Sequence, residues 1–139
     1  MRILAAGLAS VLAGCAPTPA PESASSMAPI YEPAPGSNLV LEGPIAAAPG
    51  HHLVMGDLVA PAGAAIPAHT HSGEEFLYLL AGSVTLRRVG EPDLQLRAGE
   101  AVRIAPGVVH SGLAGPKGLR AISSWVVKNG EPLRKAAGE

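Results

Sequence analysis

Residues 63–82 read G-A-A-I-P-A-H-T-H-S-G-E-E-F-L-Y-L-L-A-G. In this stretch one residue separates His69 from His71, and Glu75 follows four residues later. Successive side chains of a strand alternate between its two faces, so the two imidazoles project to the same side. The stretch therefore supplies half of a metal site from one rigid strand, and a carboxylate just beyond a Ser-Gly turn can add a third ligand.

The composition limits the chain to one small domain. Its 139 residues are 47% hydrophobic but only 3% aromatic, so Val, Leu, Ile and Ala must form the core. Such a core is sufficient for one small barrel or sandwich. The net charge of −1, without aromatic residues interleaved among the basic ones, excludes an electrostatic attraction to nucleic acid. The single cysteine, Cys15, excludes an internal disulfide.

Short apolar or alternating runs, cut by Gly and Pro at close intervals, fill the chain from Ser37 onward. This pattern predicts an all-β barrel or sandwich. The segments expected to be strands are 39–45, 52–60, 65–71, 75–80, 83–89, 94–97, 101–104, 109–113 and 119–127. His51 and His52 begin one of them. Because adjacent side chains face opposite ways, we expect these two histidines on the surface or rim rather than in one site.

Two motifs resemble those of the cupin superfamily. The pattern G-x5-H-x-H-x3-E-x6-G over residues 63–82 matches the first cupin motif at every spacing. The elements that resemble the second motif are Gly99, Pro106, Gly107 and His110. The resemblance covers about residues 50 to 133, and the tail 125–133 looks like the closing strand of small bacterial cupins. It departs from the family at Ala105, where the family has proline, and at Ala114, where it has Asn.

The resemblance implies a double-stranded β-helix, or jelly-roll, barrel over residues 37–139. The implied metal ligands, which point into the barrel mouth, are His69, His71, Glu75 and His110. Three neutral imidazoles and one carboxylate suit one divalent transition metal: Fe, Mn, Ni, Zn, Co or Cu. Four protein ligands leave two positions of an octahedral ion for water or substrate, which is typical of a catalytic metal. We also expect Arg103 and Trp125 near the mouth, in structural roles.

Alternation along the strand that starts at Glu75 assigns the following side chains to two faces. Leu77 and Leu79 share the inward face with Glu75, whereas Glu74 points elsewhere. The apolar side chains expected on the outer face are Phe76, Tyr78 and Leu80. These side chains need covering, either by the segment before Pro61 or by a second subunit, so a homodimer is one expectation.

The first 14 residues have the character of a signal peptide. A positive charge at Arg2 precedes an apolar run that is shorter than the roughly 20 residues needed to span a bilayer. The run ends in L-A-G-C, which resembles the cleavage box of bacterial lipoproteins and implies lipidation of Cys15. Ala16, rather than Asp, follows the cysteine; by resemblance to Gram-negative lipoproteins this implies an outer-membrane anchor facing the periplasm. The alternative is an ordinary signal peptide with a coincidental cysteine.

Residues 15–36 comprise this cysteine and a stretch rich in Pro, Ala and Ser, without a hydrophobic period. Such a composition predicts a disordered tether, which acts as a passive spacer or, alternatively, as a peptide ligand.

Three functions remain open at this point. The first is a membrane-tethered metal-binding cupin that binds a small molecule. The second is a metal-dependent enzyme of the dioxygenase, isomerase, lyase or decarboxylase type, with a small oxygenated substrate. The third is a non-catalytic structural barrel with a vestigial site. No further acid–base pair, spare histidine or activated Ser or Cys beside the motif names a reaction.

Overall fold

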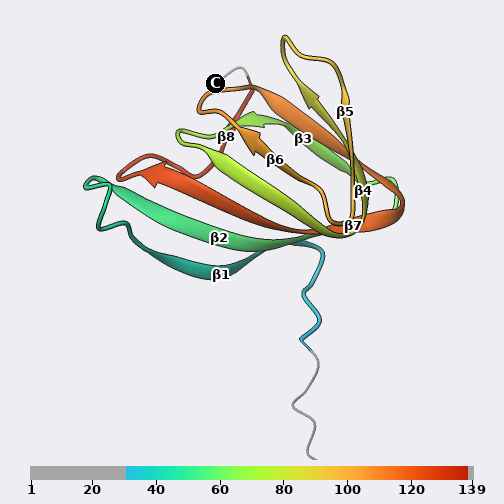
Figure 1. Ribbon diagram of the computed structural model, residues 1–139, viewed down its shortest axis with the longest axis horizontal. Coiled ribbons are helices and arrows are strands. Elements are labelled where there is room, and N and C mark those ends of the chain that lie inside the picture. The colour runs from blue at the N-terminus through green and yellow to red at the C-terminus, as the bar shows by residue number, and fades with distance from the viewer. Residues whose placement is uncertain (1–30, 138–139) are drawn as a thin grey trace, which may run out of the picture. The chain divides into compact units, whose positions relative to one another are not determined.

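The computed structural model describes residues 31–137 and is all-β over that range. Its strands, labelled in Figure 1, are β1 Gly36–Pro44, β2 His51–Ala60, β3 Ala65–Thr70, β4 Glu75–Arg88, β5 Leu94–Arg97, β6 Ala101–Ile104, β7 His110–Lys128 and β8 Lys135–Ala136. These residues contain no helix with the length and hydropathy to span a bilayer. The expected signal peptide, Cys15 and the tether up to residue 30 lie outside the described residues. Residues 31–35 precede β1 without regular secondary structure.

Strand β7 is the element on which the barrel is built. All strand pairs are antiparallel, and β7 pairs with β2, β3 and β4. Its first part, 110–114, lies against β3 and the second half of β4, whereas its second part, 119–128, lies between β2 and the first half of β4. Strands β5 and β6 pair only with β4, and β1 only with β2. Figure 1 shows β1, β2 and β7 side by side in one layer. This architecture confirms the predicted double-stranded β-helix.

Two predicted strand breaks are wrong. The segments 75–80 and 83–89 form one strand, β4, and the segments 109–113 and 119–127 form one strand, β7. Glycine bends these strands without ending them, because the pairing of β4 with β7 shifts register on both sides of Gly82. Gly82 has a positive φ of 71°, and a Cβ there would lie 2.0 Å from the carbonyl oxygen of Gly118. Only glycine permits this crossing of the two strands.

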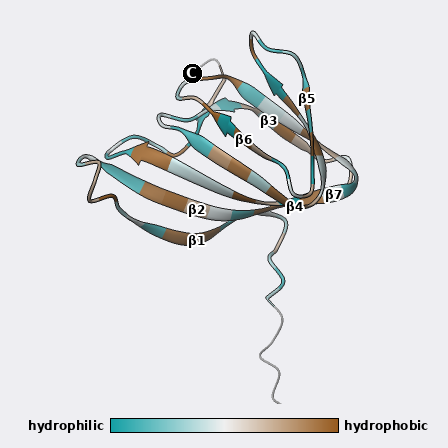
Figure 2. Ribbon diagram, in the orientation of Figure 1, coloured by the Kyte–Doolittle hydropathy of each residue, from teal (hydrophilic) through white to brown (hydrophobic). Residues whose placement is uncertain are grey.

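The core consists of aliphatic side chains from the inward faces of the strands. As predicted, Leu77 and Leu79 point inward, with exposed fractions of 6% and 0%. The main buried cluster is formed by Ala60, Leu77, Leu79, Val84, Leu86, Leu96, Ile104, Ala114, Leu119 and Ala121. A smaller cluster of Val54, Trp125 and Val127 lies apart from it. The apolar bands on β2, β4 and β7 in Figure 2 follow this arrangement.

The outer face of β4 is not covered from within the described residues. Phe76, Tyr78 and Leu80 remain 44%, 47% and 43% exposed, on the face predicted for them. The segment before Pro61 forms β1 and β2, which extend the sheet beside β7 instead of folding over this face. Within residues 31–137, therefore, the segment before Pro61 does not cover this face.

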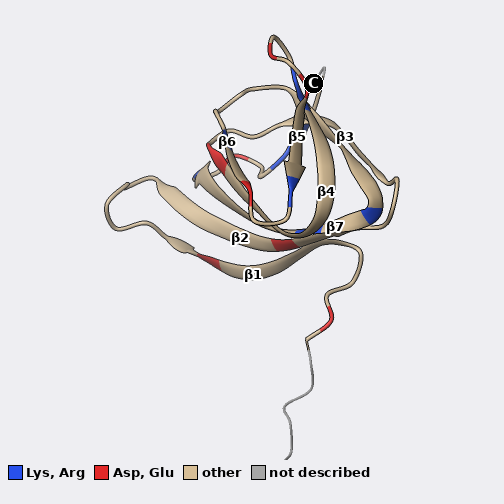
Figure 3. Ribbon diagram, turned by 45° about the vertical axis from the view of Figure 1, so that its right-hand side comes forward, with Lys and Arg blue, Asp and Glu red and all other residues tan. Residues whose placement is uncertain are grey.

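Charged residues lie on separate elements of the barrel, as Figure 3 shows. Asp57 is the one buried carboxylate of the described residues that lies outside the site discussed below. Arg120 pairs with it through two nitrogens, at distances between 2.7 and 3.2 Å. Such a bidentate pair compensates the burial of the charge, so Asp57 is explained by the architecture of the β2–β7 pair.

Candidate metal centre

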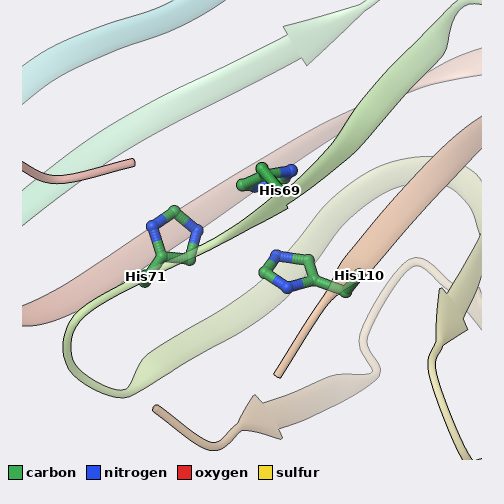
Figure 4. A group of neighbouring side chains, drawn as sticks. All are labelled: His69, His71 and His110. Atoms are coloured by element: carbon green, nitrogen blue, oxygen red, sulfur yellow. The ribbon is translucent and has the colours of Figure 1, made fainter. Parts of the chain in front are cut away.

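Three histidines from two strands and a turn meet inside the barrel (Figure 4). His69 lies on β3, His71 directly after β3, and His110 at the start of β7. The pairing of β3 with β7 places His69 opposite His110. Their ligand atoms all lie within 4.8 Å of one another, and the three side chains are 6%, 6% and 4% exposed. The structure therefore brings together the three histidines that the motifs single out.

Backbone carbonyl groups hold each imidazole in the same tautomer. A carbonyl oxygen can only accept a hydrogen bond, so the Nδ1 atom that contacts it must carry the proton. The acceptors are Pro67 for His69 at 2.7 Å, Leu133 for His71 at 2.5 Å and Val108 for His110 at 2.9 Å. Each ring therefore has an unprotonated Nε2 when it is neutral. Such outer hydrogen bonds are typical of histidines that bind a metal through the other nitrogen.

The carboxylate of Glu75 completes the arrangement at the start of β4. Its Oε1 accepts a hydrogen bond of 2.7 Å from the hydroxyl of Ser123, and its Oε2 lies 3.2 Å from Nε2 of both His71 and His110. Oε2 of Glu75 and Nε2 of His110 are both buried without a hydrogen-bond partner. With the rings neutral, these two atoms are acceptors that face each other. A cation between them, either a proton or a metal ion, removes the conflict, so the residues present fit a metal.

The indole of Trp125 contacts the same centre. Its Nε1–H donates a hydrogen bond of 3.2 Å to Nε2 of His71, and the two ring centroids are 5.7 Å apart. The indole therefore occupies the lone pair that His71 would offer to a metal. A metal ion bound to this nitrogen would displace the indole N–H, so Trp125 would report whether the site is filled.

Burial keeps the centre in the protonation state that a metal requires. Desolvation lowers the pKa of His69 to about 4, and the hydrogen bond to Pro67 opposes this only in part. Burial alone would raise the pKa of Glu75, but hydrogen bonds from His110 and His71, when these rings also carry a proton on Nε2, and from the Ser123 hydroxyl lower it well below its usual range. At neutral pH His69 is therefore a neutral imidazole and Glu75 an anion.

A cavity of about 130 Å³ adjoins the centre. The four predicted ligands and Trp125 are among the residues that line it. Most of the remaining wall is aliphatic, and six of the side chains that form it are Leu58, Ile66, Leu77, Leu86, Ile104 and Leu119. A mostly apolar cavity with a few converging polar groups is the usual form of a small-molecule site.

The other residues singled out from the sequence lie away from the cavity. Glu74 is paired with Arg103, whose Nε lies 2.9 Å from a Glu74 oxygen, so neither reaches the centre. Nδ1 of His52 lies 3.0 Å from the side-chain oxygen of Asn129, and neither His51 nor His52 lines the cavity. Of the two residues expected near the mouth, only Trp125 is there.

Sequence reasoning missed the supporting residues. Ser123 and the carbonyl group of Leu133 hold two of the predicted ligands, and Arg134 lines the cavity. Alternation along β7 places Ser123 on the same face as Trp125, but only the pairing register shows that this face meets Glu75. No pattern in the sequence marks residues 131–137 as part of the site.

The pKa of His69 predicts an acid-dependent stability of the metal-free protein. Between the folded value of about 4 and the ordinary value of 6.5, the unfolded chain binds a proton that the folded state does not. The free energy of unfolding therefore falls as the pH is lowered through this window, and the contribution is complete above it. Urea unfolding in EDTA at a series of pH values measures the slope.

In that experiment His69→Asn should flatten the slope between pH 6.5 and 4, whereas His52→Asn, outside the centre, should leave it unchanged. An equal slope in the wild type and His69→Asn would contradict the assignment.

Comparison with known proteins agrees with this architecture. The sequence profile of the family described as "Cupin domain" matches residues 57–123. A search among curated proteins finds no match. Among solved structures, a cupin-like protein from Thermotoga maritima is similar with 27% identity and a TM-score of 0.56, over 63% of this chain and 65% of that one. A protein with a double-stranded β-helix domain from Klebsiella pneumoniae is similar with 22% identity and a TM-score of 0.55, over 75% of this chain and 90% of that one.

The DMSP lyase DddQ from Ruegeria pomeroyi is similar with 23% identity and a TM-score of 0.54. This similarity covers 65% of the present chain, which spans 44% of the lyase, and at this identity it concerns the fold alone. The profile match and the shared double-stranded β-helix lead to one assignment. Residues 57–123 of the chain carry a domain of the cupin superfamily.

Proposed function

We propose that this protein is a divalent-metal-binding cupin that holds one transition-metal ion on His69, His71, Glu75 and His110 and binds a small molecule beside it. One observation carries the proposal: buried acceptor atoms of Glu75 and His110 face each other without a donor. Leaving such groups unpaired in the interior costs about 1–3 kcal/mol each, and more when one is charged. A bound cation turns this cost into a binding interaction.

The donor set limits the kind of ion. Three imidazoles and one carboxylate suit Fe, Mn, Ni, Zn, Co or Cu, and the carboxylate leaves a divalent ion with one net positive charge. When bound, such an ion supplies Lewis-acid chemistry to a ligand that occupies its free positions. The chain itself contributes the fixed tautomers, the ionised Glu75 held by Ser123, and the mostly aliphatic wall of the cavity.

The alternative is an enzyme built on the same site. The cavity beside the ligands favours it, because an ion used only for structure needs no adjoining space. Two solved structures with this fold are a DMSP lyase and an oxalate decarboxylase from Bacillus subtilis, the latter with 19% identity and a TM-score of 0.54. Lyase or decarboxylase chemistry on a small substrate is therefore the enzymatic form of the proposal. A vestigial site would keep these acceptor atoms buried and unpaired, which costs stability, without a bound ion to offset that cost.

Metal analysis tests the proposal. Wild-type protein, purified without a histidine tag and loaded with each candidate ion, should retain about one ion per chain. His69→Ala and His110→Ala should lower the affinity by more than the roughly 10–100-fold that loss of an outer hydrogen-bond partner costs. The control His52→Ala should keep the ion. Binding should also change the fluorescence of Trp125. A wild-type protein that takes up no ion under any loading condition would refute both metal-dependent functions.

The loaded protein also separates the binder from the enzyme. A dioxygenase should consume oxygen with one of a panel of small enols, thiols and catechols, whereas a lyase or decarboxylase should release a product without oxygen.

We further propose that the domain acts on a lipid anchor in the periplasm, attached to the outer membrane through Cys15. The support is the apolar leader that ends in L-A-G-C, followed by the Pro-rich segment, which would act as a spacer. Each buried CH₂ of an acyl chain contributes about 0.8 kcal/mol, so several chains on one cysteine anchor firmly. Cys15→Ser should move the protein from the membrane fraction to the soluble periplasmic fraction. Retention in the membrane would contradict the anchor.

We also propose that two copies associate through the outer face of β4. The exposed side chains of Phe76 and Tyr78 border an open groove that Val102 and Ile122 help to line. A two-fold contact between identical faces is the commonest closed assembly of soluble proteins. Light scattering should show a dimer for the wild type and a monomer for Tyr78→Glu. The control Val89→Glu, at a 74% exposed position outside the groove, should remain a dimer. A wild-type monomer at high concentration would rule out the dimer.

A further inference from the structure

Residues 131–137, the C-terminal strap, lie against the metal centre. Strand β8 of this strap pairs with β3 at His69 and Thr70, so His69 has β7 on one side and the strap on the other. The carbonyl group of Leu133 accepts the hydrogen bond that orients His71. The Leu133 side chain packs on the cluster that contains Trp125. The strap is therefore held at several points where it passes the ligands.

The strap places Arg134, an exposed residue, among the residues that line the cavity. Its Nη2 donates a hydrogen bond of 3.0 Å to the carbonyl oxygen of Pro67, which orients the side chain. This is the one hydrogen bond that the described residues provide to the five N–H groups of the guanidinium. The arginines that are paired with a carboxylate are Arg87, Arg88, Arg103 and Arg120. Arg134 has no such partner among residues 31–137.

The other residues that line the cavity leave the positive charge of Arg134 without a partner. Arg134 is its one Lys or Arg side chain, and Glu75, its one carboxylate, is engaged by the centre and Ser123. A divalent ion with Glu75 carries one net positive charge, and Arg134 adds a second. An uncompensated positive charge beside an aliphatic wall favours a ligand that has an anionic end and an apolar end.

The cavity also sets the size of the ligand. Its volume is about 130 Å³, whereas an apolar cavity of about 150 Å³ holds one benzene molecule. A ligand of about six non-hydrogen atoms therefore fills it. The planar fork of an arginine matches a carboxylate, which it binds through two parallel hydrogen bonds.

We propose that Arg134 is the recognition residue for a small monocarboxylate with a short apolar group, bound between the strap and the metal centre. This inference rests on the proposed function, because the ligand lies beside the ion that His69, His71, Glu75 and His110 hold. Arg134 is not one of the four residues that would bind the ion, and the proposal adds the chemical class of the small molecule.

The one tryptophan of the chain allows the inference to be tested without an activity assay. Trp125 lines the cavity and is 6% exposed, so its fluorescence reports what enters. The full-length protein, with and without Zn²⁺, is titrated with isobutyrate and with isobutyramide, which has the same shape and no charge. Isobutyrate should bind the wild type at least about tenfold more tightly than the amide, as loss of a charge-assisted hydrogen bond predicts.

Three substitutions locate the effect. Arg134→Gln should weaken isobutyrate binding about tenfold or more and leave the amide unchanged. Arg134→Lys should restore part of the affinity, because lysine keeps the charge but not the fork. Lys135→Gln is the matched control: it removes the same charge from the same strap, but Lys135 pairs with Glu131 and does not line the cavity. This variant should bind like the wild type.

The outcomes distinguish this inference from the proposed function. Equal affinity of the wild type and Arg134→Gln for isobutyrate, no preference over the amide, or no response to isobutyrate overturns the role of Arg134. Loss of Zn²⁺ from Arg134→Gln also overturns it, since the residue would then support the centre rather than the ligand. A wild-type protein that binds neither Zn²⁺ nor any other candidate ion refutes the metal function alone. The titration without Zn²⁺ then still decides whether carboxylate binding depends on Arg134.

Discussion

The structure depends on one constraint: the hydrogen-bond acceptor atoms of four buried side chains are held close together at one point inside the barrel. Three backbone carbonyl groups hold the imidazoles of His69, His71 and His110 in one tautomer, and Ser123 holds the carboxylate of Glu75. None of these interactions could persist in a solvated loop, where water would compete for every donor and acceptor. The aliphatic interior removes that competition, so the barrel and the centre are parts of one physical arrangement.

The arrangement of strands follows from the need to bring β3, β4 and β7 to this point. His69 and His110 are opposite each other only because β7 pairs with β3, and Glu75 reaches them only because β4 pairs with the other half of β7. The long strands must bend to serve both halves, and the crossing at Gly82 and Gly118 allows the bend. The glycine that ends the first motif is thus a packing requirement rather than a strand break.

Much of this could be predicted from local spacing. The interval between His69 and His71 and the alternation of Leu77 and Leu79 with their neighbours depend only on the two-residue period of a strand. The continuity of β4 through Gly82 could not be predicted in this way, because a glycine in a strand indicates a break as readily as a bend. The hydrogen bond of Trp125 to His71 and the two-residue strand β8 depend on pairings between distant segments, for which a single sequence carries no signal.

The position of β7 in the chain has a consequence for how the protein folds. Its partners β2, β3 and β4 all precede it, so their pairings with β7 can form only after residues 110–128 have left the ribosome. Chains dominated by such distant pairings fold slowly compared with helical proteins of similar size. Because His110 arrives on the same strand, the metal ligands and the barrel become complete in the same late step. A nascent chain therefore holds no finished centre, which fits the proposal that the leader directs the protein across a membrane before it folds.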